Sequence, residues 1–420
     1  MTNENNKKST IIFAVVSAVL LLLCLVAGVS MAKCTFTAET RPSEATPQFV
    51  GIIDSADAAT TTKLNDLRGQ SELTEILKSW ATNGNDAIKS KSGVLNFLLV
   101  CTDNGAIITN YGNADMIMLV SVNSNTKAVN IVSLDRDSFA YIPFDKGEVY
   151  AKLNAAYANT GAGLLRDTIQ QAFKIKIDYY FTLSMENLTA IIDGMGGIQM
   201  PVDATVAGYC QEDFGESIPT DAQALTGTHI AYYLREKRDG NDSRSQRQCE
   251  VVAAIIKQSQ KMGLGAKVSF LQVLAKNAHT DCLGSSALSC LRRTLISGWK
   301  TYTVATHVIP AADETVYYKN ATWVRVLDYP VVSQTLQRLL FGDSNIALNT
   351  DRLSALEVIA AVNKVYEEAS SKAAAEGTTK KAETTKADDE EDTTDEDEDL
   401  PEDDWGYDDE EPADDEDLVG

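Results

Sequence analysis

Apolar positions are arranged in two ways along this chain: one long N-terminal run, and shorter runs that recur further on. The first run, Ser9–Ala32, contains no charged residue. A helix needs about 20 mainly apolar residues to cross the hydrocarbon core of a bilayer, so residues 9–32 are predicted to form a transmembrane helix. Lys7 and Lys8 precede the run, which favours a cytoplasmic N-terminus at residues 1–8.

A cleaved signal peptide is the alternative interpretation of this run. Ser30-Met31-Ala32 resembles a small-x-small cleavage site. The apolar stretch is longer than the usual ~7–15 residues of a signal peptide, which favours an anchor. With either outcome the remainder of the chain is exported, so we expect a single-pass protein of the cell membrane with its main domain outside the cytoplasm.

Residues 33–92 are predicted to form an extracytoplasmic stalk that contains an accessory helix. The stalk begins with a stretch containing Thr, Pro and Ser, up to about Val50. From Thr62 to Trp80, leucine and isoleucine recur at roughly helical spacing. This helix should pack on the main domain or lead into it.

Short apolar runs and helical periodicities then interleave across residues 93–345. Predicted strands are Val94–Cys101, Met116–Val122, Val129–Leu134, Tyr179–Leu183, His229–Leu234, Tyr302–Val308 and Val324–Leu327. Predicted helices are Leu164–Phe173, Leu188–Met195, Arg244–Met262, Ala287–Trp299 and Val331–Phe341. The turn-rich segment 123–127 predicts a hairpin between the second and third strands. The alternation indicates an α/β domain with a central mixed β-sheet flanked by helices on both faces.

The C-terminal part of the chain carries most of its net negative charge. Residues 346–387 are expected to be a helix and linker, and residues 388–420 a disordered acidic tail. The stretch from Asp388 to Asp417 carries 21 of the 60 acidic residues and no basic one, leaving 39 acidic against 37 basic residues. The net charge of −23 therefore belongs almost wholly to the tail. Such a run buries too little apolar surface to fold.

The numbers and spacing of cysteine and histidine limit which disulfides, metal sites and catalytic triads the chain can form. An exported domain permits disulfides among the 7 cysteines, with Cys282–Cys290 and Cys210–Cys249 as candidate pairs that spacing alone does not decide. None of the cysteines lies in a metal-binding pattern. The chain has only 3 histidines, which disfavours a histidine metal site or a catalytic triad.

Charged residues gather where the predicted strands end. Asp103 follows the first predicted strand and Asp115 immediately precedes the second. Leu134–Asp137 follows the third, and Arg235–Gln248 carries a basic cluster between a predicted strand and a helix. Ligands of α/β sheets bind beyond strand ends. A lone Arg–Asp pair is more often structural, but three such groupings together favour a site. Arginines bind phosphate oxygens through paired donors, and carboxylates hold Mg²⁺ beside substrate phosphates.

Seven ordered motifs resemble the LytR–CpsA–Psr family of cell-wall glycopolymer transferases. They lie between Asn96 and about Gly342 and are Phe97–Asp103, Ala114–Val122, Ser133–Asp137, Lys152–Tyr157, Ile192–Ile198, Leu225–Arg235 and Arg244–Gln248. The resemblance implies a Mg²⁺-dependent phosphotransferase that moves an anionic glycopolymer, of the teichoic acid or capsular polysaccharide type, from an undecaprenyl-pyrophosphate carrier to peptidoglycan. The carrier lipid would enter an apolar cleft between sheet and helices. No nucleic acid partner is expected.

The resemblance also implies roles for individual residues. Asp103 and Asp115 would hold the metal, and Asp137 would orient Arg136 or help the metal. The implied catalytic residues are Asp103, Asp115, Arg136 and Asp137. The implied pyrophosphate-binding residues are Arg136, Lys152, Arg235, Lys237, Arg244, Arg247 and Gln248.

The chain departs from the family pattern at four positions. Asn113 and Gly105 stand where relatives often have Arg, and Lys237 stands where a second Arg is usual. Asn241 replaces a common Asp, for which Asp242 is a possible substitute. The phosphate clamp therefore has fewer guanidinium groups. Two alternatives stay open: a non-catalytic polyprenyl-pyrophosphate binder that regulates or scaffolds envelope assembly, and a polyprenyl-pyrophosphate pyrophosphatase.

Overall fold

The computed structural model describes a large part of the globular region. The described residues are 61–82, 88–102, 113–144, 147–221, 224–282, 298–311, 314–319, 323–348, 354–361 and 364. Outside them lie the run at 9–32 that is predicted to span the membrane, the acidic tail, Asp103 and most of the helix expected at Ala287–Trp299. Within these ranges no helix combines the length and apolar character that crossing a membrane requires.

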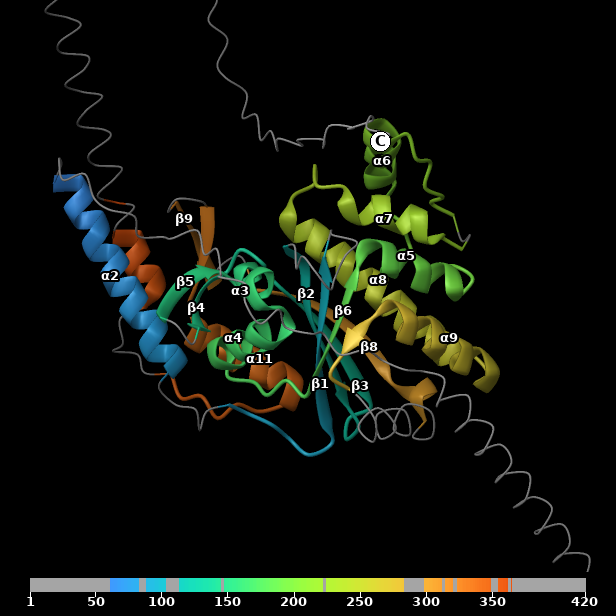
Figure 1. Cartoon of the computed structure of the whole chain (residues 1–420), viewed down its shortest axis with the longest axis horizontal. Coiled ribbons are helices and arrows are strands. Elements are labelled where there is room, and N and C mark those ends of the chain that lie inside the picture. Colours follow the sequence, from blue (N-terminus) through green and yellow to red (C-terminus); the bar gives the residue numbers. More distant parts are fainter. Residues whose placement is uncertain are drawn as a thin grey trace, which may run out of the picture. The chain divides into compact units, whose positions relative to one another are not determined.

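The main sheet has six strands in the order β7-β6-β1-β2-β3-β8 (Figure 1). Their bounds are β1 Val94–Thr102, β2 Ala114–Asn123, β3 Ala128–Leu134, β6 Tyr179–Ser184, β7 His279–Thr280 and β8 Thr303–Ile309. β2 runs antiparallel to β1 and β3, whereas β1–β6 and β3–β8 are parallel pairs. The predicted mixed sheet is confirmed. This topology brings the ends of β1 and β3 and the start of β2 to one edge.

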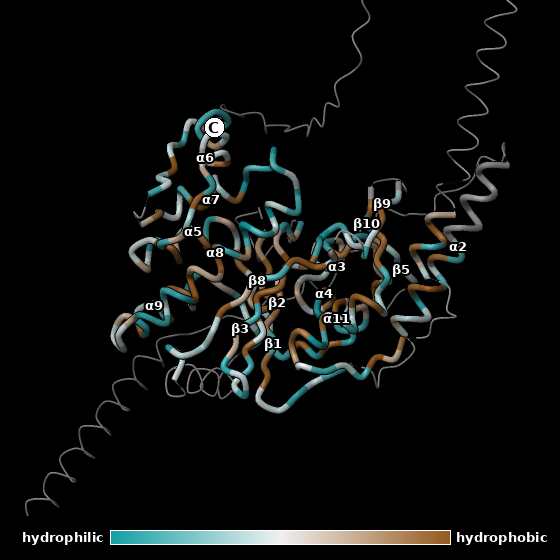
Figure 2. The backbone as a smooth tube through the Cα atoms, turned by 180° about the vertical axis from the view of Figure 1, so that it is seen from behind, coloured by the Kyte–Doolittle hydropathy of each residue, from teal (hydrophilic) through white to brown (hydrophobic). Residues whose placement is uncertain are grey.

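Both faces of the sheet are buried, which explains why its strands read as continuous apolar runs. Successive side chains of a strand point to opposite faces. Ile117 and Val132 accordingly belong to one hydrophobic core, and Met116 and Ile131 to another. In Figure 2 the hydrophobic colouring is concentrated along these central strands.

Helices cover each face, as predicted (Figure 1). One core includes side chains from α2 Thr61–Thr82, α3 Leu153–Thr160, α4 Ala162–Phe173 and α11 Tyr329–Phe341. The other includes side chains from α5 Met185–Gly194, α6 Ala204–Phe214, α7 Gly227–Arg235 and α8 Asn241–Lys261. The helix α9 Leu264–Asn277 packs on α5, and a 3₁₀ turn, η2, spans Trp299–Thr301.

Two small antiparallel sheets complete the described fold. β4 Phe139–Phe144 pairs with β5 Gly147–Lys152, and β9 Thr315–Lys319 pairs with β10 Trp323–Leu327. The predicted strand at 324–327 is therefore present, but outside the main sheet. An isolated bridge between Ser138 and Arg325 links the two small sheets.

The accessory helix α2 packs on the domain, one of the two arrangements expected for it. Leu73 and Leu77 are buried in the first core. The indole Nε1 of Trp80 donates a hydrogen bond to the Ala172 carbonyl at 2.7 Å. Lys174 Nζ donates to a carbonyl of α2, that of Ala81, at 3.0 Å.

The strand expected at His229–Leu234 is wrong, because this segment lies in α7. The Thr226 hydroxyl accepts a hydrogen bond from the His229 amide, and His229 Nδ1 accepts one from the Thr226 amide. This reciprocal pair is a capping box, which favours a helix start. Buried positions Ile230, Tyr233 and Leu234 follow helical spacing. The basic cluster at 235–248 therefore connects two helices.

The hairpin expected at 123–127 is confirmed. Asn123 Oδ1 accepts hydrogen bonds from the amides of Asn125 and Thr126, at 3.0 and 3.2 Å. Lys127 closes the turn with φ = 52°. A side-chain acceptor of this kind holds a tight turn without help from distant parts of the chain.

The candidate Cys210–Cys249 disulfide is wrong, because both residues are buried free thiols. Burial raises the pKa of Cys210 to about 11 and that of Cys249 to about 12. The second candidate pair includes Cys290, which lies outside the described residues.

Candidate functional site

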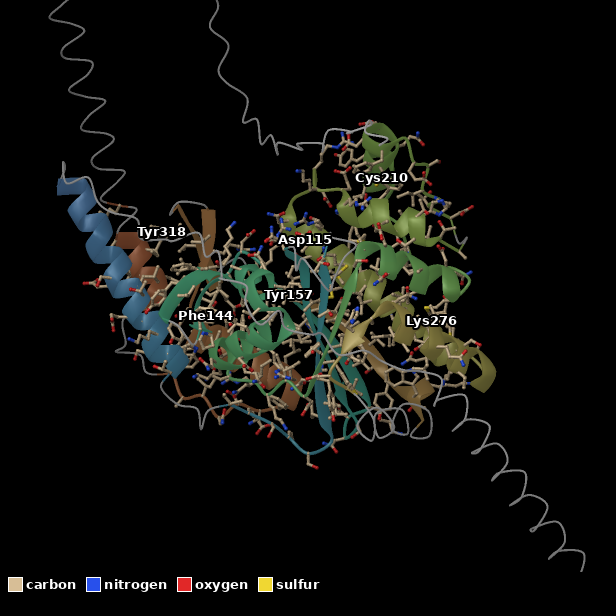
Figure 3. All side chains as sticks on the ribbon, viewed as in Figure 1. Asp115, Phe144, Tyr157, Cys210, Lys276 and Tyr318 are labelled. Atoms are coloured by element: carbon tan, nitrogen blue, oxygen red, sulfur yellow. The ribbon has the colours of Figure 1, made fainter. Side chains whose placement is uncertain are left out.

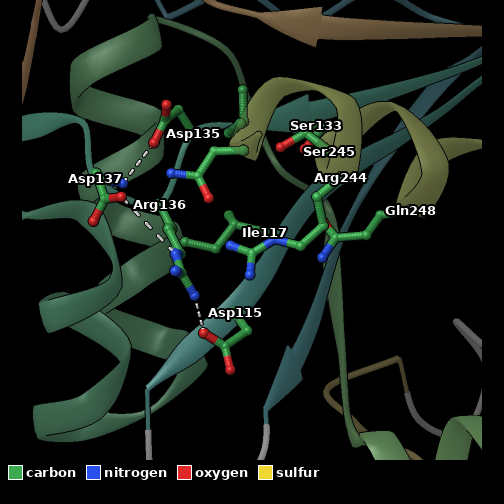
Figure 4. Close-up of a pocket in the computed structure, with 11 residues that line it drawn as sticks. Asp115, Ile117, Ser133, Asp135, Arg136, Asp137, Arg244, Ser245 and Gln248 are labelled. Atoms are coloured by element: carbon green, nitrogen blue, oxygen red, sulfur yellow. Dashed lines mark hydrogen bonds and ion pairs between the residues drawn. The ribbon is translucent and has the colours of Figure 1, made fainter. Parts of the chain in front are cut away.

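A pocket lies at the edge of the main sheet where β2 begins and β3 ends (Figure 4). Strand ends, the turn after β3 and the first turns of α8 line it. The lining residues are Asp115, Ile117, Ser133, Leu134, Asp135, Arg136, Asp137, Asn241, Arg244, Ser245 and Gln248. We call this the Asp115 pocket. Figure 3 shows Asp115 at the end of the sheet, between the two sets of helices.

Three ion pairs hold the cationic side chains on the β3 side of the pocket. Arg136 forms an ion pair with the carboxylate of Asp115. Lys152 Nζ lies 2.8 Å from Asp137 Oδ1, and Arg136 Nε lies 3.9 Å from Asp137 Oδ2. All four side chains are between 19% and 29% exposed, so they remain open to a ligand. The structure thus brings together Asp115, Arg136, Asp137 and Lys152, as the sequence predicted.

The turn that carries Arg136 is ordered by its own side chains. Asp135 Oδ1 accepts a hydrogen bond from the Asp137 amide at 2.7 Å. The Asn154 amide donates to the Arg136 carbonyl at 3.1 Å, which ties the turn to the start of α3. An aspartate that bonds the backbone two residues ahead is a recognised turn-forming device. This turn therefore presents Arg136 and Asp137 in a defined direction.

Arg244 faces the pocket from the opposite side, on α8. Its guanidinium has neither a hydrogen-bond nor an ion-pair partner among the described residues. Burial lowers its pKa, and the positive charge of Arg136 lowers it further. Asp115 and Asp137 oppose this effect. In Figure 4 the side chains of Arg136 and Arg244 extend toward the same space near Asp115. Two guanidinium groups that face each other in this way favour binding of an anion between them.

Gln248 and Arg247 lie on different faces of α8. Gln248 is one helical turn beyond Arg244 and lines the pocket. Arg247 is only 4% exposed and points into the protein. Its Nε donates to the Tyr233 carbonyl at 3.1 Å, and its other nitrogens contact Asp239 and the Glu236 carbonyl. Arg247 therefore fastens the end of α7 to α8, and does not line the pocket.

Three other residues that were proposed from the sequence for the site do not line the Asp115 pocket. Arg235 and Lys237 are exposed at the end of α7 and just after it. Asp242 Oδ1 lies 2.8 Å from Arg325, so its carboxylate is directed to that residue. Asn241 lines the pocket instead. Asp103 lies outside the described residues, and its predicted role stays a prediction.

Arg325 is a residue next to the site that sequence reasoning missed. It lies in β10, is 3% exposed, and contacts both Asp135 and Asp242. A signal was present, because an arginine in the apolar run Val324–Leu327 requires a buried charged partner. The sequence did not reveal which partner that would be.

Comparison with known proteins places these observations in a family. The LytR_cpsA_psr family model matches residues 55–339. Biofilm regulatory protein A of Streptococcus mutans is 29% identical over 230 residues, covering 51% of this chain and 57% of that protein. A polyisoprenyl-teichoic acid–peptidoglycan teichoic acid transferase of Enterococcus faecalis is 31% identical over 177 residues, covering 40% and 55%. The chain spans little more than half the length of these relatives.

A solved structure shares the fold. The crystal structure of a Streptococcus agalactiae protein superposes with a TM-score of 0.51 at 21% identity, covering 63% of this chain and 96% of that one. At this identity the likeness supports the architecture alone.

Proposed function

Because the chain belongs to the LytR–CpsA–Psr family, we propose that it transfers an anionic glycopolymer from a polyprenyl-pyrophosphate carrier to a hydroxyl of peptidoglycan. The observation that carries this proposal is the half-buried guanidinium of Arg244, which lies opposite Arg136 and forms no direct ion pair with a carboxylate among the described residues. A pyrophosphate supplies the missing negative charge. The names of several relatives, which are teichoic acid transferases, point to the same substrate class.

The proposed reaction is phosphoryl transfer by positioning and charge neutralisation. The acceptor hydroxyl oxygen forms a bond to the sugar-side phosphorus. The bond from that phosphorus to the bridging oxygen breaks, and polyprenyl phosphate leaves with the electron pair. The hydroxyl proton passes to a pocket carboxylate or to water. Arg136 and Arg244 bind phosphate oxygens and stabilise the charge that develops on the leaving group.

Mg²⁺ is part of this proposal. Proteins commonly hold Mg²⁺ through one or two carboxylates together with substrate phosphates and water. Asp115 offers a carboxylate in the pocket, and Asp103 would be the second ligand. In the described ranges no group of three or more His, Cys, Asp or Glu is arranged for a metal. When bound, Mg²⁺ neutralises charge on the pyrophosphate oxygens.

We also propose that residues 9–32 anchor the protein in the membrane, with the domain outside the cytoplasm. The lipid end of the proposed substrate stays in the bilayer. A pocket tethered beside the bilayer meets that substrate at a high effective concentration.

The test uses the full chain in nanodiscs with a polyprenyl-pyrophosphate-linked glycopolymer, Mg²⁺ and a labelled peptidoglycan oligomer. Labelled product and polyprenyl phosphate should form together. Asp115→Asn and Arg136→Gln should each lower the rate at least about a hundredfold. Arg166→Gln is the matched control, since Arg166 pairs with Asp281 at 2.7 Å outside the pocket. Release of polyprenyl phosphate without labelled oligomer would identify a pyrophosphatase.

A second candidate function is a non-catalytic polyprenyl-pyrophosphate binder that regulates or scaffolds envelope assembly. One observation favours it: Arg247 is engaged within the protein, and Lys237 replaces a guanidinium, so fewer arginines are directed to a ligand. Tight binding of the carrier without turnover in the same assay would support this function and exclude the transferase.

A further inference from the structure

Arg325 connects the two sides of the Asp115 pocket. Its guanidinium Nη1 lies 2.8 Å from Asp242 Oδ1 and also pairs with Asp135 Oδ2. Asp135 opens the turn after β3, and Asp242 lies in the first turn of α8. These two segments are separated by about a hundred residues in the sequence. One buried side chain from a third segment, β10, therefore holds both.

Arg325 contacts the turn at 135–137 through both its backbone and its side chain. The Arg325 amide donates a hydrogen bond to the Asp137 carbonyl at 2.9 Å. Asp135, which the guanidinium holds through Oδ2, accepts the Asp137 amide through Oδ1 (dashed in Figure 4). Both backbone groups of Asp137 thus depend on Arg325, directly or through one side chain. The neighbouring residue in this turn is Arg136.

The contact with α8 is made near Arg244. Asp242 precedes Arg244 by two residues within the same helix, so the start of α8 is fixed where Asp242 meets Arg325. Asp242 is 61% exposed, whereas Arg325 is 4% exposed at its side chain. Arg325, the buried member of the pair, determines where the start of α8 lies, because the exposed carboxylate of Asp242 retains rotamer freedom until Arg325 holds it.

Burial disfavours the charged forms of Asp135 and Arg325, so each of these charges needs its partner. Burial raises the pKa of Asp135, and Arg325 opposes that rise. Burial would lower the pKa of Arg325, but Asp135 and Asp242 raise it. Both contacts are made by one guanidinium nitrogen, Nη1. The planar guanidinium holds that nitrogen rigidly, whereas a lysine presents a compact charge on a flexible stem, so lysine at this position should hold the two carboxylates less firmly.

We propose that Arg325 is a positioning residue that sets the separation of Arg136 and Arg244, and thereby the fit of a pyrophosphate between them. The inference rests on the proposed function for the identity of the ligand. Arg325 itself does not line the pocket. It acts through the turn at 135–137 and through the start of α8.

The first test is a double-mutant cycle on the full chain, with binding of inorganic pyrophosphate and Mg²⁺ measured by calorimetry. Arg325→Lys should weaken binding about tenfold. Arg136→Lys or Arg244→Lys should each weaken pyrophosphate binding on its own. Adding Arg325→Lys to either variant should cause little further loss of affinity, because the separation of the two guanidinium groups is already lost. Arg166→Lys, the control, should combine additively with both. Additive losses for Arg325→Lys would show a merely structural role and overturn the proposal.

The second test does not depend on the ligand. Hydrogen exchange in Arg325→Lys should accelerate at least about fivefold at two separate segments, 135–138 and 241–245, and leave the β2–β3 hairpin unchanged. Unchanged exchange at either segment would refute the coupling. A wild-type chain that binds no pyrophosphate or polyprenyl pyrophosphate would instead refute the proposed function, whatever the exchange result.

A milder variant covers the case in which Arg325→Lys fails to fold. Asp242→Asn changes only the exposed partner of Arg325. It should accelerate exchange at 241–245 alone, and it should couple to Arg244→Lys but not to Arg136→Lys. Equal coupling to both arginines, or to neither, would contradict the proposed division of the contacts.

Discussion

At the scale of single residues, the charge of Arg244 governs the Asp115 pocket. A half-buried guanidinium that faces another guanidinium costs free energy in the ligand-free protein. The same placement becomes favourable when an anion binds, because hydrogen bonds between charged groups are the strong ones. Arg244 therefore lowers the stability of the ligand-free protein and raises its affinity for an anion, as active-site residues often do.

This exchange predicts opposite effects for one substitution. Arg244→Gln should leave the melting temperature of the ligand-free chain unchanged or higher, since it removes repulsion with Arg136. It should weaken pyrophosphate binding at least about tenfold, because one charged hydrogen-bonding group is lost. Differential scanning fluorimetry and calorimetry measure the two effects. A lower melting temperature with unchanged affinity would mean that Arg244 is structural.

At the scale of the element, the attachment of α2 depends on a buried lysine. Lys174 is fully buried, and its Nζ lies 5.2 Å from the centroid of the Trp80 ring. Burial lowers the pKa of Lys174 from 10.5 to about 8. Below pH 8 the folded protein contains a buried charge. Between pH 8 and 10.5 the folded state loses that proton while the unfolded chain keeps it, so this residue's contribution to stability rises with pH.

Urea unfolding can measure this contribution. The free energy of unfolding of the wild type, relative to Lys174→Met, should increase by roughly 2 kcal/mol between pH 7 and pH 10. The comparison with the variant removes the effects of other groups that titrate in this range, such as Cys210 and Tyr233. A constant difference across this range would show that Lys174 has its ordinary pKa.

The start of α7 offers a second prediction at this scale. Thr226→Ala removes the hydroxyl that caps the helix, and should destabilise the protein by about 1 kcal/mol. Thr228→Ala, two residues further on at an exposed position in the first turn of the helix, is the matched control and should change stability by less than about 0.5 kcal/mol. Equal effects at the two threonines would argue against the capping box.

At the scale of the whole described domain, two hydrophobic cores share one sheet. Leu98 and Met118 are both fully buried, on opposite faces. Leu98→Ala and Met118→Ala should each cost about 2–5 kcal/mol, and each should lower one common unfolding transition, since neither core survives without the sheet. Leu348→Ala, at a position 39% exposed, should cost far less. Two separate calorimetric transitions would contradict this coupling.

Sequence reasoning succeeded where structure is decided locally. The strands β1 to β3 follow from short continuous apolar runs and the helix α8 from helical spacing of its apolar residues, and both signals act between near neighbours. The side chains of Asp115, Arg136 and Asp137 were correctly expected to meet, because strand ends of a sheet gather at one edge. The hairpin at 123–127 likewise depends on contacts within five residues.

Other features were decided only by tertiary contacts. The segment at 229–234 is apolar enough for a strand or a helix, and the cap together with its packing on α5 selects the helix. Arg247 and Gln248 are adjacent in sequence and both are buried, but the rotation of α8 turns Arg247 toward the end of α7 and Gln248 into the lining of the pocket. Arg325 and Asp135 are 190 residues apart. The sequence by itself determined which charges are present and where strands and helices alternate. Only the folded chain decided which charges are paired and which face a ligand, because pairing requires contacts between segments that periodicity does not connect.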